Sequence, residues 1–190
     1  MKLWREMGLQ FNMNLLKPAV FLDRDGVLTK EKSYVCTVEE LEIFSYAFEC
    51  VQQIKNKGYY TIVVTNQSGI ARGLFTEVDL HKIHVYLKQE TGVDAIYYCP
   101  HHPEGKIQQY QKICHCRKPG TGMIEQACSD YRIDMNRSFM IGDRAGDIIA
   151  GQKAGLKTIL LESGYGSERL EANVKPDYIF KDLRMVADVL

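Results

Sequence analysis

The stretch Ala19-Val20-Phe21-Leu22-Asp23-Arg24-Asp25-Gly26 decides how the chain folds. Its first four residues are apolar without alternation, which is typical of a parallel strand buried on both faces of a sheet. The run ends abruptly in two aspartates separated by one residue, and Gly26 allows the chain to turn sharply. We therefore expect a buried strand at 19–22 that carries two carboxylates at its carboxyl end.

The same pattern of an apolar run followed by polar residues recurs along the chain. The β-branched segment 60–65 predicts a second buried strand, and the polar turn Asn66-Gln67-Ser68-Gly69 follows it. The segment 138–141 predicts another strand, which ends in Gly142-Asp143. Further strands are expected at 93–98, 156–161 and 178–180.

Helices are expected between these strands. Thr37 and Glu40 form a capping box, and apolar residues recur at helical spacing until Gly58, which predicts a helix between these limits. Two more helices are predicted from Thr76 to about Gly92 and at about 121–131. Alternating strands and helices imply right-handed crossovers, so we predict an α/β fold with a three-layer, Rossmann-like parallel sheet and helices on both faces.

Length and composition favour one globular domain. The 190 residues are 45% apolar and 25% charged, and Lys plus Arg and Asp plus Glu both total 24. This balance gives no basic field that would attract nucleic acid or an anionic membrane. Residues 1–17 lack the apolar centre of a signal peptide. We therefore expect an N-terminal extension at 1–17 and a domain at 18–190, in a monomeric cytoplasmic protein.

The predicted strand ends place acidic and polar side chains at one edge of the sheet. Asp23 and Asp25, Thr65 and Asn66, and Asp143 each follow a different strand, where parallel sheets bind their ligands. Carboxylates gathered there repel one another unless a hard cation such as Mg²⁺ joins them. Such residues also serve as turn formers and helix caps. The ordered recurrence of the motifs, with a later Lys118, favours a site.

Three of the six cysteines cluster with a histidine in the segment 99–116. Two close pairs, separated by twelve residues, offer four ligands to a tetrahedral Zn²⁺ ion: Cys99, His101, Cys114 and Cys116. Four protein ligands leave no open position, so this zinc is expected to be structural. His102 or His115 could replace a ligand, and idle thiols are the alternative to a metal site. Cys36, Cys50 and Cys128 are expected to be core or surface thiols.

Taken together, these motifs resemble those of the haloacid dehalogenase superfamily of phosphatases over roughly residues 18 to 185. The matching residues are Asp23-Arg24-Asp25-Gly26-Val27, Thr65-Asn66, Lys118, and Asp143 with Asp147. The resemblance implies that Asp23 is the nucleophile that forms a phospho-aspartate and that Asp25 is the acid and base. It also implies that Mg²⁺ binds Asp23, Asp143 and the backbone carbonyl of Asp25, and that Thr65 and Lys118 donate to the phosphoryl oxygens. Asp147 would orient Lys118 or, alternatively, be a solvated helix residue.

Within that superfamily the chain is similar to the histidinol-phosphate and D-glycero-D-manno-heptose 1,7-bisphosphate phosphatases. The shared stretches are 21–26, 65–73 and 99–103. Members of this family lack a large cap domain, and the long spacing between His101 and Cys114 resembles the heptose branch. The resemblance thus implies removal of the 7-phosphate from a small phosphorylated sugar. A histidinol-phosphate or other small phosphomonoester phosphatase is the alternative, and a non-catalytic zinc-stapled binding module is a third.

The same resemblance assigns residues to the substrate pocket. They are Glu31, Lys32, Ser33, Tyr34, Asn66, Gln67, Ser68, Arg117 and Arg144. Arg117 would recognise the distal phosphate. Arg144 departs from the heptose enzymes, which typically carry Lys there, and replaces a compact ammonium with a planar guanidinium. For Arg24 and Arg72 the sequence does not distinguish a role in the site from an exposed loop charge.

Overall fold

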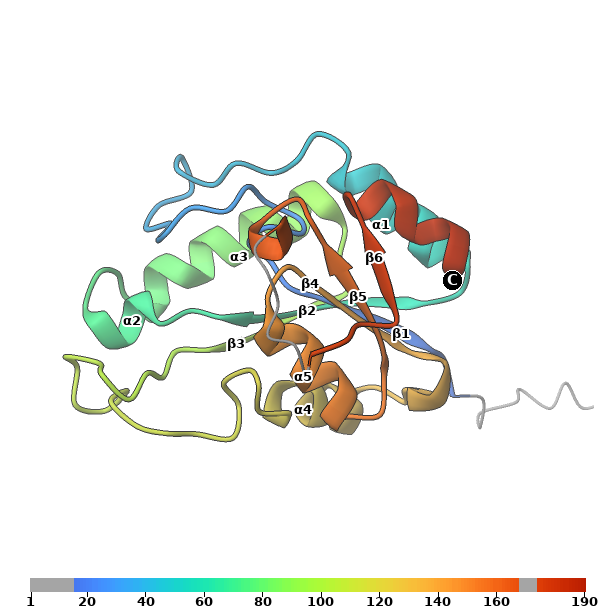
Figure 1. Ribbon diagram of the computed structural model, residues 1–190. Helices are drawn as coiled ribbons and strands as arrows, with labels where there is room; N and C mark the ends of the chain where they lie inside the picture. The colour runs from blue at the N-terminus through green and yellow to red at the C-terminus, as the bar shows by residue number, and fades with distance from the viewer. Residues whose placement is uncertain (1–15, 168–173) are drawn as a thin grey trace, which may run out of the picture.

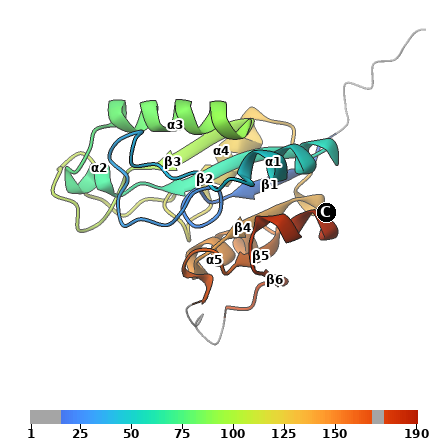
Figure 2. The same ribbon diagram turned by 90° about the horizontal axis from the view of Figure 1, so that it is seen from above.

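A six-stranded parallel sheet forms the centre of the protein in the computed structural model, which describes residues 16–167 and 174–190. The strands run in the order β3-β2-β1-β4-β5-β6. Figure 2 shows β3 and β6 at opposite ends of this sheet. The strands are β1 (Ala19–Leu22), β2 (Tyr60–Asn66), β3 (Ala95–Cys99), β4 (Phe139–Gly142), β5 (Lys157–Leu161) and β6 (Tyr178–Phe180).

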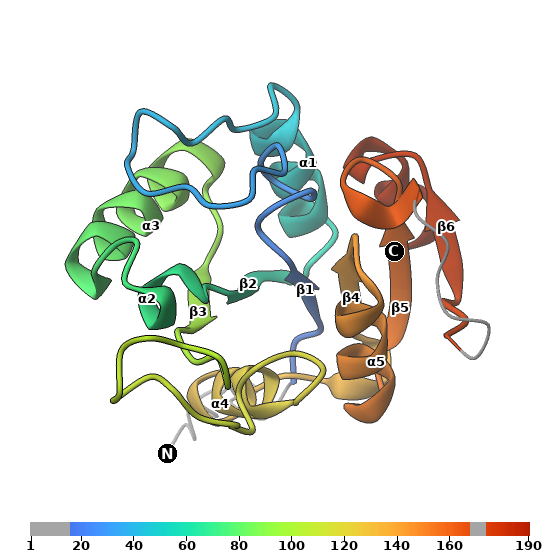
Figure 3. The same cartoon turned by 60° about the vertical axis from the view of Figure 1, so that its left-hand side comes forward.

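Helices cover both faces of the sheet. Figure 3 shows α1 and α3 on one side and α4 and α5 on the other. The predicted three-layer α/β fold is thereby confirmed. The helices are α1 (Ala47–Asn56), α2 (Gly69–Arg72), α3 (Glu77–Thr91), α4 (Gly122–Asp130) and α5 (Ala145–Lys153), with 3-10 segments η1 (Met135–Arg137), η2 (Tyr165–Ser167) and η3 (Leu183–Val189).

The central strand β1 has the bounds that the sequence predicts. All four of its residues are 0% exposed, as expected for a strand with neighbours on both edges and helices on both faces. Leu22 lies opposite Val63 of β2 and Ile141 of β4, so β1 and β4 end within one residue of each other, while β2 continues to Asn66. Asp23 therefore leaves the sheet beside Gly142 and Asp143, and its N–H donates to the Ile141 carbonyl at 2.9 Å.

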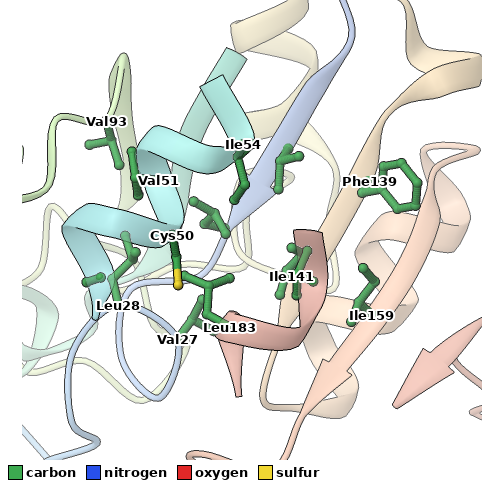
Figure 4. Close-up of a cluster of buried hydrophobic side chains, with 14 of the residues drawn as sticks. Val27, Leu28, Cys50, Val51, Ile54, Val93, Phe139, Ile141, Ile159 and Leu183 are labelled. Carbon is green, nitrogen blue, oxygen red and sulfur yellow. The ribbon is translucent and has the colours of Figure 1, made fainter. Parts of the chain in front are cut away.

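The larger core cluster lies between the sheet and the layer of α1 and η3. Figure 4 shows Val51 and Ile54 of α1, Ile141 of β4 and Leu183 of η3 in this cluster. Each of these side chains is at most 1% exposed. Burying such a side chain stabilises the fold by roughly 1.5–3 kcal/mol. This packing fixes the edge of the sheet from which the aspartates project.

The prediction of a helix that begins at Thr37 is wrong for the first half of that segment, because α1 starts only at Ala47. The segment before it runs alongside residues 28–30 instead. The Lys30 N–H donates to the Glu42 carbonyl and the Phe44 N–H donates to the Leu28 carbonyl. Glu40 does not close a capping box; its carboxylate accepts the Cys36 N–H at 2.7 Å. Apolar spacing that resembled a helix reflects loop packing here.

Other predicted elements agree with the structure more closely. The capping box that opens α3 is present, with Thr76 accepting the Asp79 N–H, and Gly92 ends the helix in the left-handed conformation. The short helix α2 replaces part of a predicted turn. The predicted extension falls mainly outside the described residues, but Lys17 already pairs with Ile133. Among the helices described, none has the length and apolarity needed to cross a membrane.

Candidate active site

A cavity of about 390 Å³ opens where the strands end. Figure 1 shows α2, the chain after β1 and the long loop after β3 at this end of the sheet. Every residue predicted to be catalytic or to bind substrate borders this cavity: Asp23, Asp25, Glu31, Lys32, Ser33, Tyr34, Thr65, Asn66, Gln67, Ser68, Arg117, Lys118 and Arg144. Arg24, Arg72, His102 and Asp147 border it as well.

A buried ammonium group joins two carboxylates at the floor of the cavity. Lys118 Nζ lies 2.9 Å from Asp23 Oδ1 and 2.6 Å from Asp147 Oδ1. Burial alone would lower the pKa of Lys118, but Asp147 and Asp23 raise it above its ordinary value. The lysine therefore carries a permanent positive charge beside Asp23. Asp147 is only 2% exposed, so the alternative of a solvated helix residue is wrong.

Asp143 lies next to this ion-paired group and has a free carboxylate oxygen. Its Oδ2 accepts the Tyr165 N–H at 2.8 Å, whereas its buried Oδ1 has no hydrogen-bond partner among the described residues. Burial, Asp23 and Asp147 raise the pKa of Asp143 to about 8. Ligand oxygens of Asp23, Asp143 and Asp147 lie within 4.8 Å of one another. An unpartnered oxygen among three carboxylates fits a divalent cation with oxygen ligands.

Gly26 keeps the approach to Asp143 open. It adopts φ +79°, and a Cβ at this position would collide with the Asp143 carboxylate. The turn after β1 therefore requires glycine both for its backbone conformation and for the close passage of the chain.

The Asp25 carboxylate is turned toward the neighbouring arginine. Arg24 Nε donates to Asp25 Oδ1 at 3.0 Å, and Arg24 Nη2 donates to Asp25 Oδ2 at 2.9 Å. Thr29 and Gln67 donate to the same carboxylate, each at 3.2 Å. Arg24 is 1% exposed, so the alternative of an exposed loop charge is wrong for this residue. The fork-shaped pairing fixes the plane of the Asp25 carboxylate.

The polar residues after β2 bond to one another and to the lysine segment. Asn66 accepts the Lys118 N–H at 3.0 Å and donates to the Lys118 carbonyl at 3.1 Å. Gln67 donates to Thr65 Oγ1 at 2.9 Å. Thr65 is 1% exposed. These bonds position Lys118 and Thr65, so the amides of Asn66 and Gln67 have an orienting role that the sequence did not reveal.

The remaining residues predicted to bind substrate differ in the contacts that their side chains make. Arg144 Nη2 lies 3.3 Å from Glu31 Oε1, and its guanidinium stacks 3.9 Å over the Tyr165 ring. Burial and then Asp25 raise the pKa of Glu31 to about 7, against the effect of Arg144. The Lys32 ammonium instead pairs with Glu42 at 2.7 Å. Ser33, Tyr34 and Ser68 border the cavity, and no side-chain hydrogen bond to another residue of 16–167 or 174–190 holds them there.

The cysteine and histidine side chains of the loop after β3 meet in one cluster, which we call the thiol cluster (Cys99, His101, Cys114 and Cys116). Its sulfur atoms lie 3.2 to 3.5 Å apart, and His101 Nδ1 lies 3.3 Å from Cys116 Sγ and 3.6 Å from Cys99 Sγ. A tetrahedral Zn²⁺ ion with bonds of roughly 2.0–2.3 Å sets its ligand atoms about 3.3–3.8 Å apart, within a few tenths of an ångström of these separations. The four side chains therefore fit such an ion.

The protonation of these groups also suits a cation. Burial raises the pKa of the Cys99 thiol, so a nearby positive charge is needed to hold it as a thiolate. Burial lowers the pKa of His101, which favours the neutral, ligating imidazole. His115 Nε2 points to the Glu125 carboxylate at 2.9 Å, and His102 Nδ1 accepts the Glu104 N–H at 3.1 Å. Neither neighbour is directed into the cluster.

Comparison with known proteins gives the family. A HAD-hydrolase-like family model matches residues 115–186. The D-glycero-beta-D-manno-heptose-1,7-bisphosphate 7-phosphatase of Haemophilus ducreyi is 40% identical over 173 residues, which cover 88% of this chain and 94% of that protein. The D-glycero-alpha-D-manno-heptose-1,7-bisphosphate 7-phosphatase of Photorhabdus laumondii is 38% identical over 180 residues, which cover 91% and 98%.

A solved structure agrees with these relatives. The D,D-heptose 1,7-bisphosphate phosphatase from B. bronchiseptica, complexed with magnesium and phosphate, superposes with a TM-score of 0.79 at 30% identity, covering 90% of this chain and 96% of that chain. Both the sequence likeness and the superposition cover about nine tenths of this chain. The chain therefore belongs to the heptose-1,7-bisphosphate 7-phosphatase family of haloacid dehalogenase-like hydrolases.

Proposed function

We propose that this chain removes the 7-phosphate of D-glycero-D-manno-heptose 1,7-bisphosphate through a phospho-aspartate on Asp23. The observation that carries this proposal is the buried ion-paired group at the floor of the cavity, where Lys118 lies 2.9 Å from Asp23 and 2.6 Å from Asp147. A fixed cation beside a carboxylate nucleophile is suited to a highly anionic phosphoryl group. The names of the relatives supply the substrate.

The first half of the reaction transfers the phosphoryl group to the protein. The Arg24 N–H and the Lys118 ammonium both contact Oδ1 of Asp23, at 2.8 and 2.9 Å, which leaves Oδ2 available for attack. Oδ2 forms a bond to phosphorus while the bond from phosphorus to the sugar oxygen breaks. Asp25 gives its proton to that leaving oxygen. Thr65 and Lys118 donate to the phosphoryl oxygens and offset the charge that spreads over them.

The second half returns the protein to its starting state. A water molecule gives a proton to Asp25 and attacks phosphorus, and the bond between phosphorus and Asp23 breaks to release inorganic phosphate. Asp25 thereby regains the proton that it lost. Because one carboxyl group acts as acid and then as base, its orientation matters in both steps, and Arg24 sets that orientation.

Both expected metals fit the residues present. The Asp23 and Asp143 carboxylates and the Asp25 backbone carbonyl would hold Mg²⁺, which when bound neutralises negative charge on the nucleophile and the phosphoryl oxygens. The thiol cluster would hold a structural Zn²⁺ ion. Its last ligand, Cys116, directly precedes Arg117 and Lys118, so an ordered loop fixes where these two cations point.

The substrate assignment includes the far end of the cavity. We propose that Arg117 and Arg144 recognise parts of the sugar bisphosphate other than the reacting phosphate. Relatives that act on the alpha anomer and on the beta anomer are similarly close in identity, so we propose the bisphosphate without one anomer. Histidinol phosphate remains the rival substrate. We also propose that the protein is cytoplasmic and that it acts as a monomer. Gel filtration would test the monomeric state.

The decisive experiment combines one variant with a panel of substrates. Purified protein with Mg²⁺ should release phosphate from the heptose bisphosphate anomers in preference to histidinol phosphate and sugar monophosphates. Asp23→Asn should lower kcat by at least about 1,000-fold in a protein that still folds, because the amide is a poor nucleophile. Asp188→Asn, on the exposed part of η3, is the matched control. Retained turnover in Asp23→Asn would contradict the nucleophile assignment.

A further inference from the structure

Arg72 and His102 border the active-site cavity, and the reaction steps above use neither. Arg72 is the last residue of α2, and His102 lies in the long loop after β3. Two backbone bonds join these segments, because the Lys106 and Ile107 N–H groups both donate to the Ala71 carbonyl, at 2.7 and 3.0 Å. These backbone bonds hold the two side chains next to each other in the cavity wall.

The hydrogen bonds of His102 fix which ring nitrogen carries the proton. The Glu104 backbone N–H donates to His102 Nδ1 at 3.1 Å, so Nδ1 is an acceptor and is unprotonated. A neutral imidazole then carries its proton on Nε2. That nitrogen lies 3.3 Å from Arg72 Nη2. Since a guanidinium has only donors, two N–H donors face each other there.

Two N–H donors that point toward each other cannot bond to each other, so an acceptor placed between or beside them would be bound by both. Arg72 Nε is also buried and has no hydrogen-bond partner in the described part of the chain. A buried donor left without a partner destabilises the state without ligand. Arg117 borders the same cavity, and its Nη1 donates to the His101 carbonyl at 3.3 Å, beside His102. The wall therefore presents a positive, donor-rich surface.

We infer that Arg72 and His102 together bind an oxygen of the substrate's second phosphate, the one that is not hydrolysed. An anionic oxygen accepts from both donors at once and removes the conflict between them. The inference rests on the proposed function and extends it, because it assigns two further residues to the distal end of the bisphosphate. Arg72 and His102 would then determine specificity for a bisphosphate over a monophosphate.

The test compares two substrates that differ only in the distal phosphate, heptose 1,7-bisphosphate and heptose 7-phosphate. The measured quantity is the ratio of kcat/KM for the first substrate to kcat/KM for the second. Arg72→Gln should lower this ratio about 10- to 100-fold, as expected for the loss of hydrogen bonds to a charged group. Arg137→Gln, which removes an exposed arginine away from the cavity, should leave the ratio as in the wild type.

The histidine allows a matched pair of variants that keeps the test decisive even if Arg72→Gln does not fold. His102→Gln places an amide donor near the position of Nε2 and should retain the ratio within about threefold, whereas His102→Asn has no donor there and should lower it about tenfold. A wild-type preference that survives in His102→Asn would overturn this inference alone, whether or not Arg72→Gln folds. A wild-type enzyme that does not prefer the bisphosphate would overturn the proposed function and this inference together.

Discussion

Two polar clusters lie at the same edge of the sheet but are built differently. The carboxylate centre, which comprises Asp23, Lys118, Asp143 and Asp147, is carried mainly by β1, β4 and α5, and all four residues are at most 8% exposed. The thiol cluster lies at the end of β3 and in the loop that follows, and three of its four residues are only half-buried. The first cluster is part of the core, and the second is attached to it.

The difference shows how each cluster is held in place. The carboxylate centre contains its own cation, Lys118, so opposite charges meet before any metal binds. Three thiols and an imidazole have no such internal partner and depend on an added cation to stay together as ligands. We therefore expect changes in the carboxylate centre to affect stability and catalysis together, and changes in the thiol cluster to act mainly on one loop.

The largest effect on stability is expected from Asp147→Asn. This variant leaves the buried Lys118 with a single carboxylate, and breaking a buried ion pair destabilises a protein by about 3–5 kcal/mol. The same change frees the ammonium to turn, so kcat should fall about 100-fold. Chemical unfolding and steady-state kinetics measure both effects. Asp188→Asn is the control, and wild-type stability and activity in Asp147→Asn would show that the two clusters do not differ in this way.

The next effect is on the pH dependence of folding stability, measured in protein freed of metal, where Asp143 of the carboxylate centre should dominate. The folded state holds a proton on Asp143 up to about pH 8, whereas an unfolded aspartate loses it near pH 4. The unfolded state therefore binds fewer protons in between, and stability falls as pH rises through this window. Between pH 6.5 and 8 we expect a loss of about 1.5 kcal/mol, because the slope of about 1.4 kcal/mol per pH unit falls to half at the folded pKa.

The control for this pH effect is Asp143→Asn, which should lack the loss. The comparison is made with that variant because other groups titrate too; burial and Asp25 raise the pKa of Glu31 to about 7, which adds a loss of the same sign up to about that pH, so the difference between the two profiles isolates Asp143. Saturating Mg²⁺ should also remove the loss, since a bound cation favours the ionised carboxylate. Equal pH profiles for wild type and Asp143→Asn would contradict the assignment.

A smaller effect on stability is expected from Cys114→Ser. Removing one ligand should lower the zinc content of the purified protein from about one ion to near zero and destabilise it by about 1–2 kcal/mol, or roughly 2–8 °C in Tm. Cys99 alone among the four residues belongs to a strand, so we expect the loss to stay below that of Asp147→Asn. Cys36→Ser, which changes a half-buried thiol outside the cluster, is the control. Unchanged Tm after chelation would argue against a structural metal.

The same contrast explains how much of the molecule could be predicted from the sequence. Strand β1 and the positions of Asp23 and Asp143 follow from apolar runs that stop at acidic residues, because a buried strand leaves few other arrangements. The same reasoning gave a wrong prediction for the segment before α1, where it predicted a helix. Leu41 and Phe44 have helical spacing, yet they pack as part of a loop bonded to residues 28–30, and local spacing does not reveal such long-range pairing.

The site shows a similar limit. The strand end predicted that Asp25 borders the cavity, and the family resemblance predicted the same of Gln67, but neither predicted what these side chains contact. Arg24 was left open in the sequence because an arginine between two aspartates is compatible with an exposed turn. Its burial depends on how the turn after β1 folds back, with the Leu28 and Thr29 N–H groups bonded to the Arg24 carbonyl. Only the folded turn shows that the Arg24 guanidinium donates to the Asp25 carboxylate.

The smallest predicted effect tests that pairing within the catalytic region. Arg24→Lys keeps the positive charge but replaces the fork, whose Nε and Nη2 contact the two Asp25 oxygens, by a single ammonium. A misaligned acid matters most when the leaving oxygen needs a proton, so hydrolysis of an alkyl phosphate should slow about tenfold, equivalent to about 1.4 kcal/mol. Hydrolysis of p-nitrophenyl phosphate, whose leaving group needs little protonation, should slow less. An equal loss on both substrates would mean that Arg24 supports the fold of the turn rather than the orientation of the acid.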